Sequence, residues 1–151
     1  MAIKIIERPA LTVVGLGIRT KPMSPDIPAL WSGFVARIDE IPNAAEPRVS
    51  YGVMRHEADT LHYMAAVSVS APGPVPQGMQ SQVIPAGSYA TFRYPLSGLG
   101  KGFGEIFNQL LPASGFAPID GAPMFERYDE AFDPGIPSSM VEICIPVRRK
   151  D

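Results

Sequence analysis

The sequence predicts an α+β fold in which two tandem β-α-β-β repeats, related by pseudo-twofold symmetry, place antiparallel sheets and two helices around a central cleft. The chain has 17 prolines and 14 glycines among 151 residues, which is too many helix breakers for an all-helical bundle. Extended runs rich in β-branched residues alternate with two segments in which apolar residues recur every three or four positions, as they do in an amphipathic helix. In addition, features of the first half recur in the second.

The first half predicts a strand, a helix and a hairpin. Residues 10–18 follow Pro9 and are rich in β-branched side chains, which favours a strand. A helix is expected over residues 29–41, where apolar side chains recur every three or four positions. Residues 48–55 and 61–70 are extended runs around a polar turn, which indicates a β-hairpin.

The second half predicts the same order of elements. Prolines at every other position from residue 72 to residue 76 indicate a stiff linker that cannot enter a sheet or a helix. The elements expected after it are an extended run over 79–94, a helix over 99–111, and strands over 124–128 and 139–147.

Similar residues recur in the two halves at a constant spacing in the sequence. Pro9 and Pro85 introduce the two long strands and lie 85 − 9 = 76 positions apart, and the same distance separates Trp31 from Phe107. Neither half can cover its own apolar face, so we expect the two halves to associate about a pseudo-twofold axis. A single continuous barrel would need strands where the two helical stripes lie. The predicted domain spans residues 1–151, with repeat one over about 1–70, a linker over about 71–78 and repeat two over about 79–151.

Composition excludes several classes of function. Thirteen basic and 15 acidic side chains give a formal net charge of −2, with no basic stripe for a nucleic acid backbone. Cys144 is the single cysteine, so neither a disulfide framework nor a cysteine metal site is expected. No segment resembles a signal peptide or a membrane span. We expect a cytoplasmic protein without cofactor or metal.

Two carboxylates interrupt apolar strands. In residues 139–147, strand alternation sets Glu142 on one face with Met140 and Cys144. Glu126 lies in residues 124–128 and shares a face with Tyr128. If the strands belong to one sheet, both carboxylates can face one cavity. The alternative is that each lies on a solvated sheet face, which is common for glutamate.

A partly desolvated carboxylate beside aromatic rings and flexible methionines favours a flat, lipophilic cation. Aromatic faces attract cations, and methionine adapts to ligands of different shapes. The residues expected to line such a cleft are Glu126, Glu142, Tyr128, Trp31, Tyr51, Met64, Met140 and Phe107.

Other motifs predict less. His56 and His62 flank a turn with acidic residues, but two histidines without cysteine are more typical of an exposed loop than of a metal site. A core thiol is the simpler interpretation of Cys144, since no histidine lies nearby in the sequence. Trp31 lies one position off the apolar helix stripe, so it can face the groove between the halves or pack at the helix edge.

Several of these segments together resemble the gyrase-inhibitor-like domain, which is also the effector-binding domain of AraC-type and multidrug-responsive bacterial transcription activators. The similar segments are residues 84–94, Pro112, 114–116, 123–128 and 142–147, and more loosely residues 5–15 and 30–34. The resemblance covers nearly the whole chain.

The resemblance implies two β-α-β-β units around a central cleft. It also implies that acidic residues on the closing strands, here Glu126 and Glu142 with Tyr128, hold cationic lipophilic compounds. No helix-turn-helix segment precedes the domain, so we expect a free-standing sensor or sequestering module, similar to members carried on integron cassettes. A protein partner or a homodimer is left open.

Three classes of function remain. The leading hypothesis is a binding protein for cationic amphiphiles. The second is a hydrolase, because some relatives are thought to cleave electrophilic compounds, with Glu126 or Glu142 as general base. The third is a protein–protein inhibitor with an incidental cleft.

Overall fold

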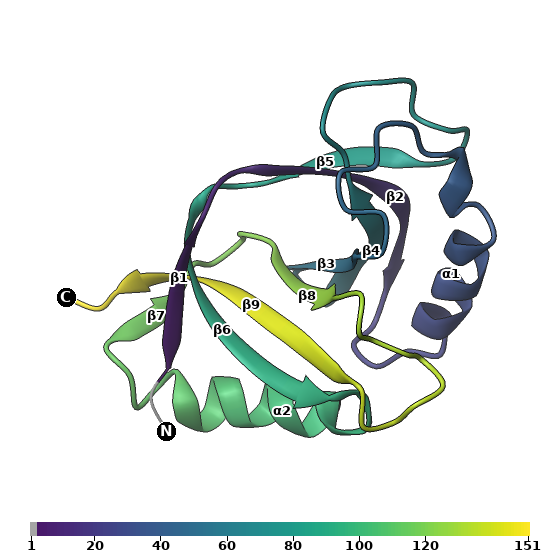
Figure 1. The fold of residues 1–151 in the computed structure, drawn as a ribbon. Coiled ribbons are helices and arrows are strands. Elements are labelled where there is room, and N and C mark those ends of the chain that lie inside the picture. The colour runs from purple at the N-terminus through teal and green to yellow at the C-terminus, as the bar shows by residue number, and fades with distance from the viewer. Residues whose placement is uncertain (1–2) are drawn as a thin grey trace.

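Two helices and nine antiparallel strands form the fold of residues 3–151, the part of the chain that the computed structural model describes (Figure 1). The helices are α1 (Asp26–Val35) and α2 (Leu99–Glu105), and α2 continues as a π-helical turn over Ile106–Leu110. The strands are β1 (Lys4–Arg8), β2 (Leu11–Thr20), β3 (Ser50–Glu57), β4 (Thr60–Ser68), β5 (Gln80–Ile84), β6 (Gly87–Pro95), β7 (Phe116–Pro118), β8 (Met124–Tyr128) and β9 (Met140–Arg149).

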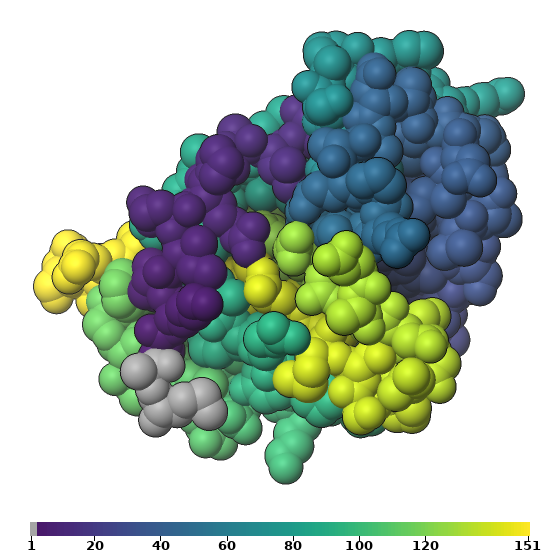
Figure 2. Space-filling view, in the orientation of Figure 1, coloured from purple at the N-terminus to yellow at the C-terminus, as the bar shows by residue number. Residues whose placement is uncertain are grey.

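The order of the strands is symmetric. The sheet runs β1-β6-β9-β8-β3-β4-β2-β5, and β7 adds to β9. The counterparts in the two halves are β1 and β5, β2 and β6, β3 and β8, and β4 and β9. Replacing each strand by its counterpart gives the same order read backwards, as expected for a twofold axis between β3 and β8. In the space-filling view the yellow-green residues after position 120 lie against the blue first half (Figure 2). Within the sheet, the two halves are joined by the pairing of β3 with β8. The predicted α+β fold with pseudo-twofold symmetry is confirmed.

Each half also lends one strand to the other half. β1, from the start of the chain, pairs with β6, and β5, which follows the proline-rich segment, pairs with β2. These exchanged strands bind the halves together through backbone hydrogen bonds as well as through side chains. The boundaries proposed for the two repeats stay a prediction.

The bent sheet has two different faces. Both helices lie on its outer side (Figure 1), and we call this side the helix face. Side chains there pack with α1 or α2, as Val67 and Ile143 do. The opposite side, the inner face, holds a cluster without helix residues that includes Tyr51, Met64 and Phe125. Because strand side chains alternate, one residue of shift in a strand moves a side chain from one face to the other.

The largest differences from the predicted elements concern the first helix, the run over 79–94 and two short strands. The first helix begins at Asp26 and ends at Val35, with a 3-10 turn over Ile38–Glu40 in place of its predicted last turns. The run over 79–94 divides into β5 and β6 around Pro85, which has no amide hydrogen to donate to a ladder. β1 and β7 were not predicted, because five and three residues are too few for a clear periodicity.

The helices found in residues 3–151 are all too short or too polar to span a membrane.

Candidate functional site

Glu126 is a buried carboxylate on the helix face of β8. Its exposed fraction is 6%. The Tyr63 hydroxyl donates a hydrogen bond to Glu126 Oε1 at 2.8 Å, and the Tyr128 hydroxyl donates another to the same oxygen at 2.7 Å. Tyr63 comes from β4 in the first half, whereas Glu126 and Tyr128 come from β8 in the second. The carboxylate therefore lies where the two halves meet.

The backbone makes room for this carboxylate at Gly52. Gly52 on β3 is directly opposite Glu126 on β8. A Cβ atom at position 52 would lie 2.3 Å from the Tyr63 hydroxyl and 2.6 Å from Glu126 Oε1. A side chain at position 52 would occupy this space. Glycine leaves it free, and this allows the hydrogen bond between Tyr63 and Glu126.

Further aromatic rings contact the two tyrosines that bind the carboxylate. Trp31 of α1 donates from Nε1 to the Tyr63 hydroxyl at 2.9 Å, and its ring meets that of Tyr128 edge to face at 5.3 Å between centroids. The ring of Phe132, in the loop after β8, lies 4.7 Å from that of Tyr128. Phe103 of α2 packs on the cluster around Tyr63. Trp31 therefore contacts Tyr63 of the first half and Tyr128 of the second half.

Burial changes the acidity of all three hydrogen-bonded groups. Desolvation raises the pKa of Glu126, although the hydrogen bonds from Tyr128 and Tyr63 oppose the rise. Desolvation, followed by the charge of Glu126, places the pKa of Tyr63 and of Tyr128 well above the ordinary value. Both hydroxyls therefore keep their protons and remain donors to the carboxylate.

The raised pKa of Glu126 predicts a pH-dependent stability. Because the pKa is higher in the folded state than the usual 4.5, the stability that Glu126 contributes is complete below pH 4.5 and falls as the pH rises through the folded-state value. The free energy of unfolding of the native protein, minus that of Glu126→Gln, should decrease over this range and then level off. Urea unfolding between pH 4 and pH 8 measures it, with exposed Glu130→Gln as the control. A difference that is constant or grows with pH would contradict the expectation.

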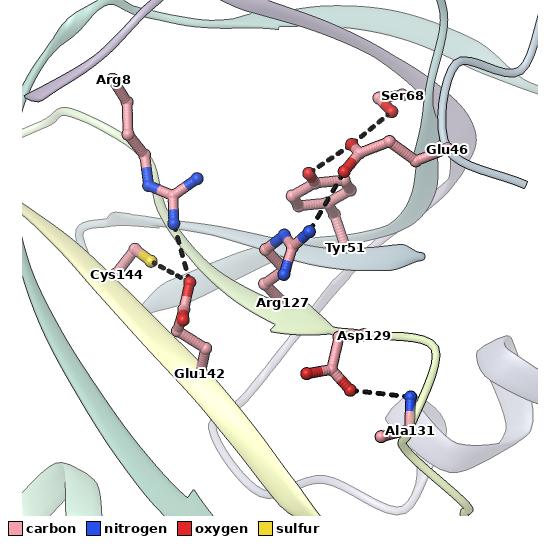
Figure 3. A network of polar contacts seen from close by, with 9 residues as sticks. All are labelled: Arg8, Glu46, Tyr51, Ser68, Arg127, Asp129, Ala131, Glu142 and Cys144. Atoms are coloured by element: carbon pink, nitrogen blue, oxygen red, sulfur yellow. Dashed lines mark hydrogen bonds and ion pairs between the residues drawn. The ribbon is translucent and has the colours of Figure 1, made fainter. Parts of the chain in front are cut away.

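Glu142 lies on the other face of the sheet. Across β8 and β9, Glu126 is opposite Ile143, and Glu142 is opposite Arg127, so the two carboxylates point to different sides. Arg8 of β1 donates to Glu142 Oε1 at 2.7 Å (Figure 3). The prediction that both carboxylates face one cavity is wrong. Alternation within each strand was read correctly, but the relative register of two strands is a property of the folded sheet.

A second ion pair occupies the inner face. Glu46, before β3, accepts hydrogen bonds from Tyr51 at 2.7 Å and Ser68 at 2.8 Å, and it pairs with Arg127 at 3.2 Å (Figure 3). Burial opposes ionisation of Glu46, but these three donors outweigh it and lower its pKa. Burial and the adjacent Glu46 raise the pKa of Tyr51 to about 12. Glu46, like Glu142, is therefore already paired with an arginine side chain.

The structure thus divides the eight predicted residues. Glu126, Tyr128 and Trp31 come together on the helix face. Tyr51 and Met64 belong to the inner-face cluster. Met140, at the start of β9, is 38% exposed, and Phe107, on the π-helical turn, is 37% exposed. Strand alternation places Tyr51, Met64 and Met140 on the face of the sheet opposite to Glu126.

Tyr63, Gly52 and Phe132 were missed. Alternation in residues 61–70 could have found Tyr63, since it places Tyr63 and the predicted Met64 on opposite faces. Gly52 has no sequence signal, because its role depends on which residue lies across from it. Cys144 is fully buried, and burial is the main reason that its pKa rises to about 12, as suits a core thiol.

Comparison with known proteins agrees with this fold. Residues 1–148 match the family described as "GyrI-like small molecule binding domain". The transcriptional regulator BrlR of Pseudomonas aeruginosa is 35% identical over 151 residues, which cover 97% of this chain and 56% of BrlR. The chain thus spans about half the length of that regulator.

Solved structures share the architecture at lower identity. SAV2435, solved bound to tetraphenylphosphonium, superposes with a TM-score of 0.74 at 18% identity, covering 98% of this chain and 94% of that one. An integron cassette protein from the mobile metagenome of Vibrio cholerae gives 0.63 at 21% identity, covering 97% and 95%. With nearly all of its length matched, this chain belongs to the family of GyrI-like small-molecule binding domains.

Proposed function

We propose that this protein binds lipophilic organic cations at Glu126. The observation that carries the proposal is that Glu126, at 6% exposure, has no cationic partner among residues 3–151, whereas Glu46 and Glu142 are each paired with an arginine. A buried carboxylate without a counter-ion is costly, and the cost is recovered when a cation arrives.

The surroundings of Glu126 favour a lipophilic cation over a metal ion. Both hydrogen bonds reach Oε1, which leaves Oε2 without a hydrogen-bond donor within the described chain. The rings of Trp31 and Phe132 both contact the ring of Tyr128, which binds Glu126, and an aromatic face can attract a cation by about 0.5–2 kcal/mol. The ligand reported for SAV2435, an aromatic phosphonium, is of this class. Such a site suits a sensor or a sequestering module.

Entry requires the aromatic cover to move. Trp31 is held beside the two tyrosines that bind Glu126, by its hydrogen bond to Tyr63 and by its edge contact with Tyr128. Its helix, α1, has ten residues, no side-chain cap at its N-terminus and one fully buried residue, Phe34. A short helix with few anchors can shift at low cost. The ligand replaces the Trp31 contacts with its own.

A pair of ligands of equal shape and opposite charge tests the proposal. Tetraphenylphosphonium should produce a saturable change in the fluorescence of Trp31, the single tryptophan, because it displaces that ring. Tetraphenylborate should not bind at Glu126, since a buried carboxylate repels it. Equal binding of the two ions would mean that apolar contact alone drives association and would refute recognition of charge.

A hydrolase is the second candidate, and the raised pKa of Glu126 is the observation that favours it, since a general base works best near the operating pH. An activated ester such as p-nitrophenyl acetate distinguishes the two. Consumption of the ester that is abolished in Glu126→Gln supports a hydrolase. Binding of tetraphenylphosphonium without ester turnover supports the receptor.

A further inference from the structure

Three basic side chains form a row on the inner face, away from Glu126. In the sheet, Arg19 of β2 is directly opposite His62 of β4, and His62 is directly opposite Arg55 of β3. Opposite residues of antiparallel strands share a face with their Cβ atoms roughly 5 Å apart. Arg19 and Arg55 are therefore two guanidinium groups on the same face of the sheet, one on either side of His62, and strands two apart place them about 10 Å from each other.

Few acidic side chains lie close enough to this row to neutralise its positive charge. Glu57 lies 3.2 Å from His62, and it is itself mostly exposed. Arg19 and Arg55 form no ion pair within residues 3–151, although the chain as a whole carries a net charge of −2. Positive charge is thus concentrated at one place on a slightly acidic protein.

The row borders a cavity of about 280 Å³. Its floor includes the apolar side chains of Val53 and Met64, and Gln80 and Gln82 of β5 line another wall. None of the described residues that line the cavity is acidic. The volume falls just below the range of drug-sized pockets, roughly 300–1,000 Å³, and exceeds the roughly 150 Å³ that holds benzene.

The glycine at position 17 allows Gln80 to pack closely in the wall of the cavity. A Cβ atom at Gly17 would lie 2.1 Å from Nε2 of Gln80, so the amide of Gln80 packs over the backbone at this position. Gly17 is directly opposite Met64, which sets the amide beside the apolar floor. An amide nitrogen is a hydrogen-bond donor and complements an anion further.

From this arrangement we infer that the inner-face cavity binds a small organic anion, with its carboxylate or phosphate group at Arg19, His62 and Arg55 and its apolar part on Val53 and Met64. Guanidinium groups bind such anions through charge-assisted hydrogen bonds. The side chains that would hold the anion lie on the face of the sheet opposite to Glu126, whereas Tyr63, which also borders the cavity, has its hydroxyl on the Glu126 face.

The test uses benzoate as the probe and benzamide as its neutral counterpart. In two-dimensional NMR titrations of the full chain, benzoate should shift the amide signals of Gly17, Val53 and Met64, and benzamide should shift them far less. Arg19→Gln and Arg55→Gln should each weaken benzoate binding about tenfold, because each removes a charge-assisted contact. Both arginines are exposed, so the variants are expected to fold.

Two controls make the outcome decisive. Arg48→Gln removes an exposed arginine that does not line the cavity and should change benzoate affinity less than twofold. Glu126→Gln should also leave benzoate binding unchanged, which separates this site from the cation site. The inference is overturned if benzoate does not bind, if benzamide binds equally well, or if both arginine variants retain the native affinity.

Discussion

Glu126→Gln should weaken the binding of tetraphenylphosphonium by roughly 30- to 150-fold. The substitution keeps the shape of the side chain and an oxygen that can accept hydrogen bonds from Tyr63 and Tyr128. It replaces Oε2 by an uncharged NH2 group and so removes the Coulombic attraction to the cation, which is about 2–3 kcal/mol for unit charges roughly 6–8 Å apart at an effective dielectric constant of about 20. Titration of the two proteins, followed by Trp31 fluorescence, measures the difference.

Glu142→Gln is the matched control for this experiment. Glu142 lies in the neighbouring strand, but its side chain points to the opposite face and is paired with Arg8 at 2.7 Å. We expect its loss to change tetraphenylphosphonium affinity less than threefold. A large loss in Glu142→Gln together with an unaffected Glu126→Gln would place the cation on the inner face and refute the site proposed here.

The affinity for the cation should also depend on pH. Desolvation raises the pKa of Glu126 in the free protein, so part of the free energy of binding is used to displace a proton wherever the carboxyl group is protonated. Affinity should therefore increase as the pH rises through this pKa, and the dependence should disappear in Glu126→Gln.

Gly52→Ala should lower the free energy of unfolding by about 2–4 kcal/mol. The added methyl group would meet the Tyr63 hydroxyl at 2.3 Å and Glu126 Oε1 at 2.6 Å, so these groups must move apart. Overpacking costs about 1–3 kcal/mol, and a buried polar group left without its partner costs a similar amount. Urea unfolding measures the loss, and tetraphenylphosphonium affinity should fall with it because Glu126 is displaced.

Gly33→Ala provides the opposite expectation within the same protein. Gly33 lies in α1, and a Cβ atom there would contact nothing within 4 Å. Replacing glycine by alanine inside a helix should therefore raise the free energy of unfolding by about 0.5–1 kcal/mol. If Gly52→Ala costs less than 0.5 kcal/mol, the close contacts at Gly52 do not hold the carboxylate in place.

Periodicity in the sequence was sufficient to predict most of the fold. Alternation in residues 124–128 and 139–147 correctly grouped Glu126 with Tyr128 and Glu142 with Cys144. The symmetric strand order agrees with the repeat inferred from Pro9 and Pro85. These are local properties, because which way a side chain points within a strand depends only on its neighbours in the chain.

The composition of the site depended on contacts between strands that are distant in the sequence. Whether Glu126 and Glu142 share a cavity is decided by the register of β8 against β9, and that Gly52 lies under the carboxylate is decided by the register of β3 against β8. The basic row of Arg19, His62 and Arg55 likewise exists only once three strands are paired. The sequence by itself therefore determined most of the strands, the repeat and the residue types of the proposed cation site. Only the tertiary structure decided which of those residues meet, since strand pairing is selected by the packing of the whole sheet.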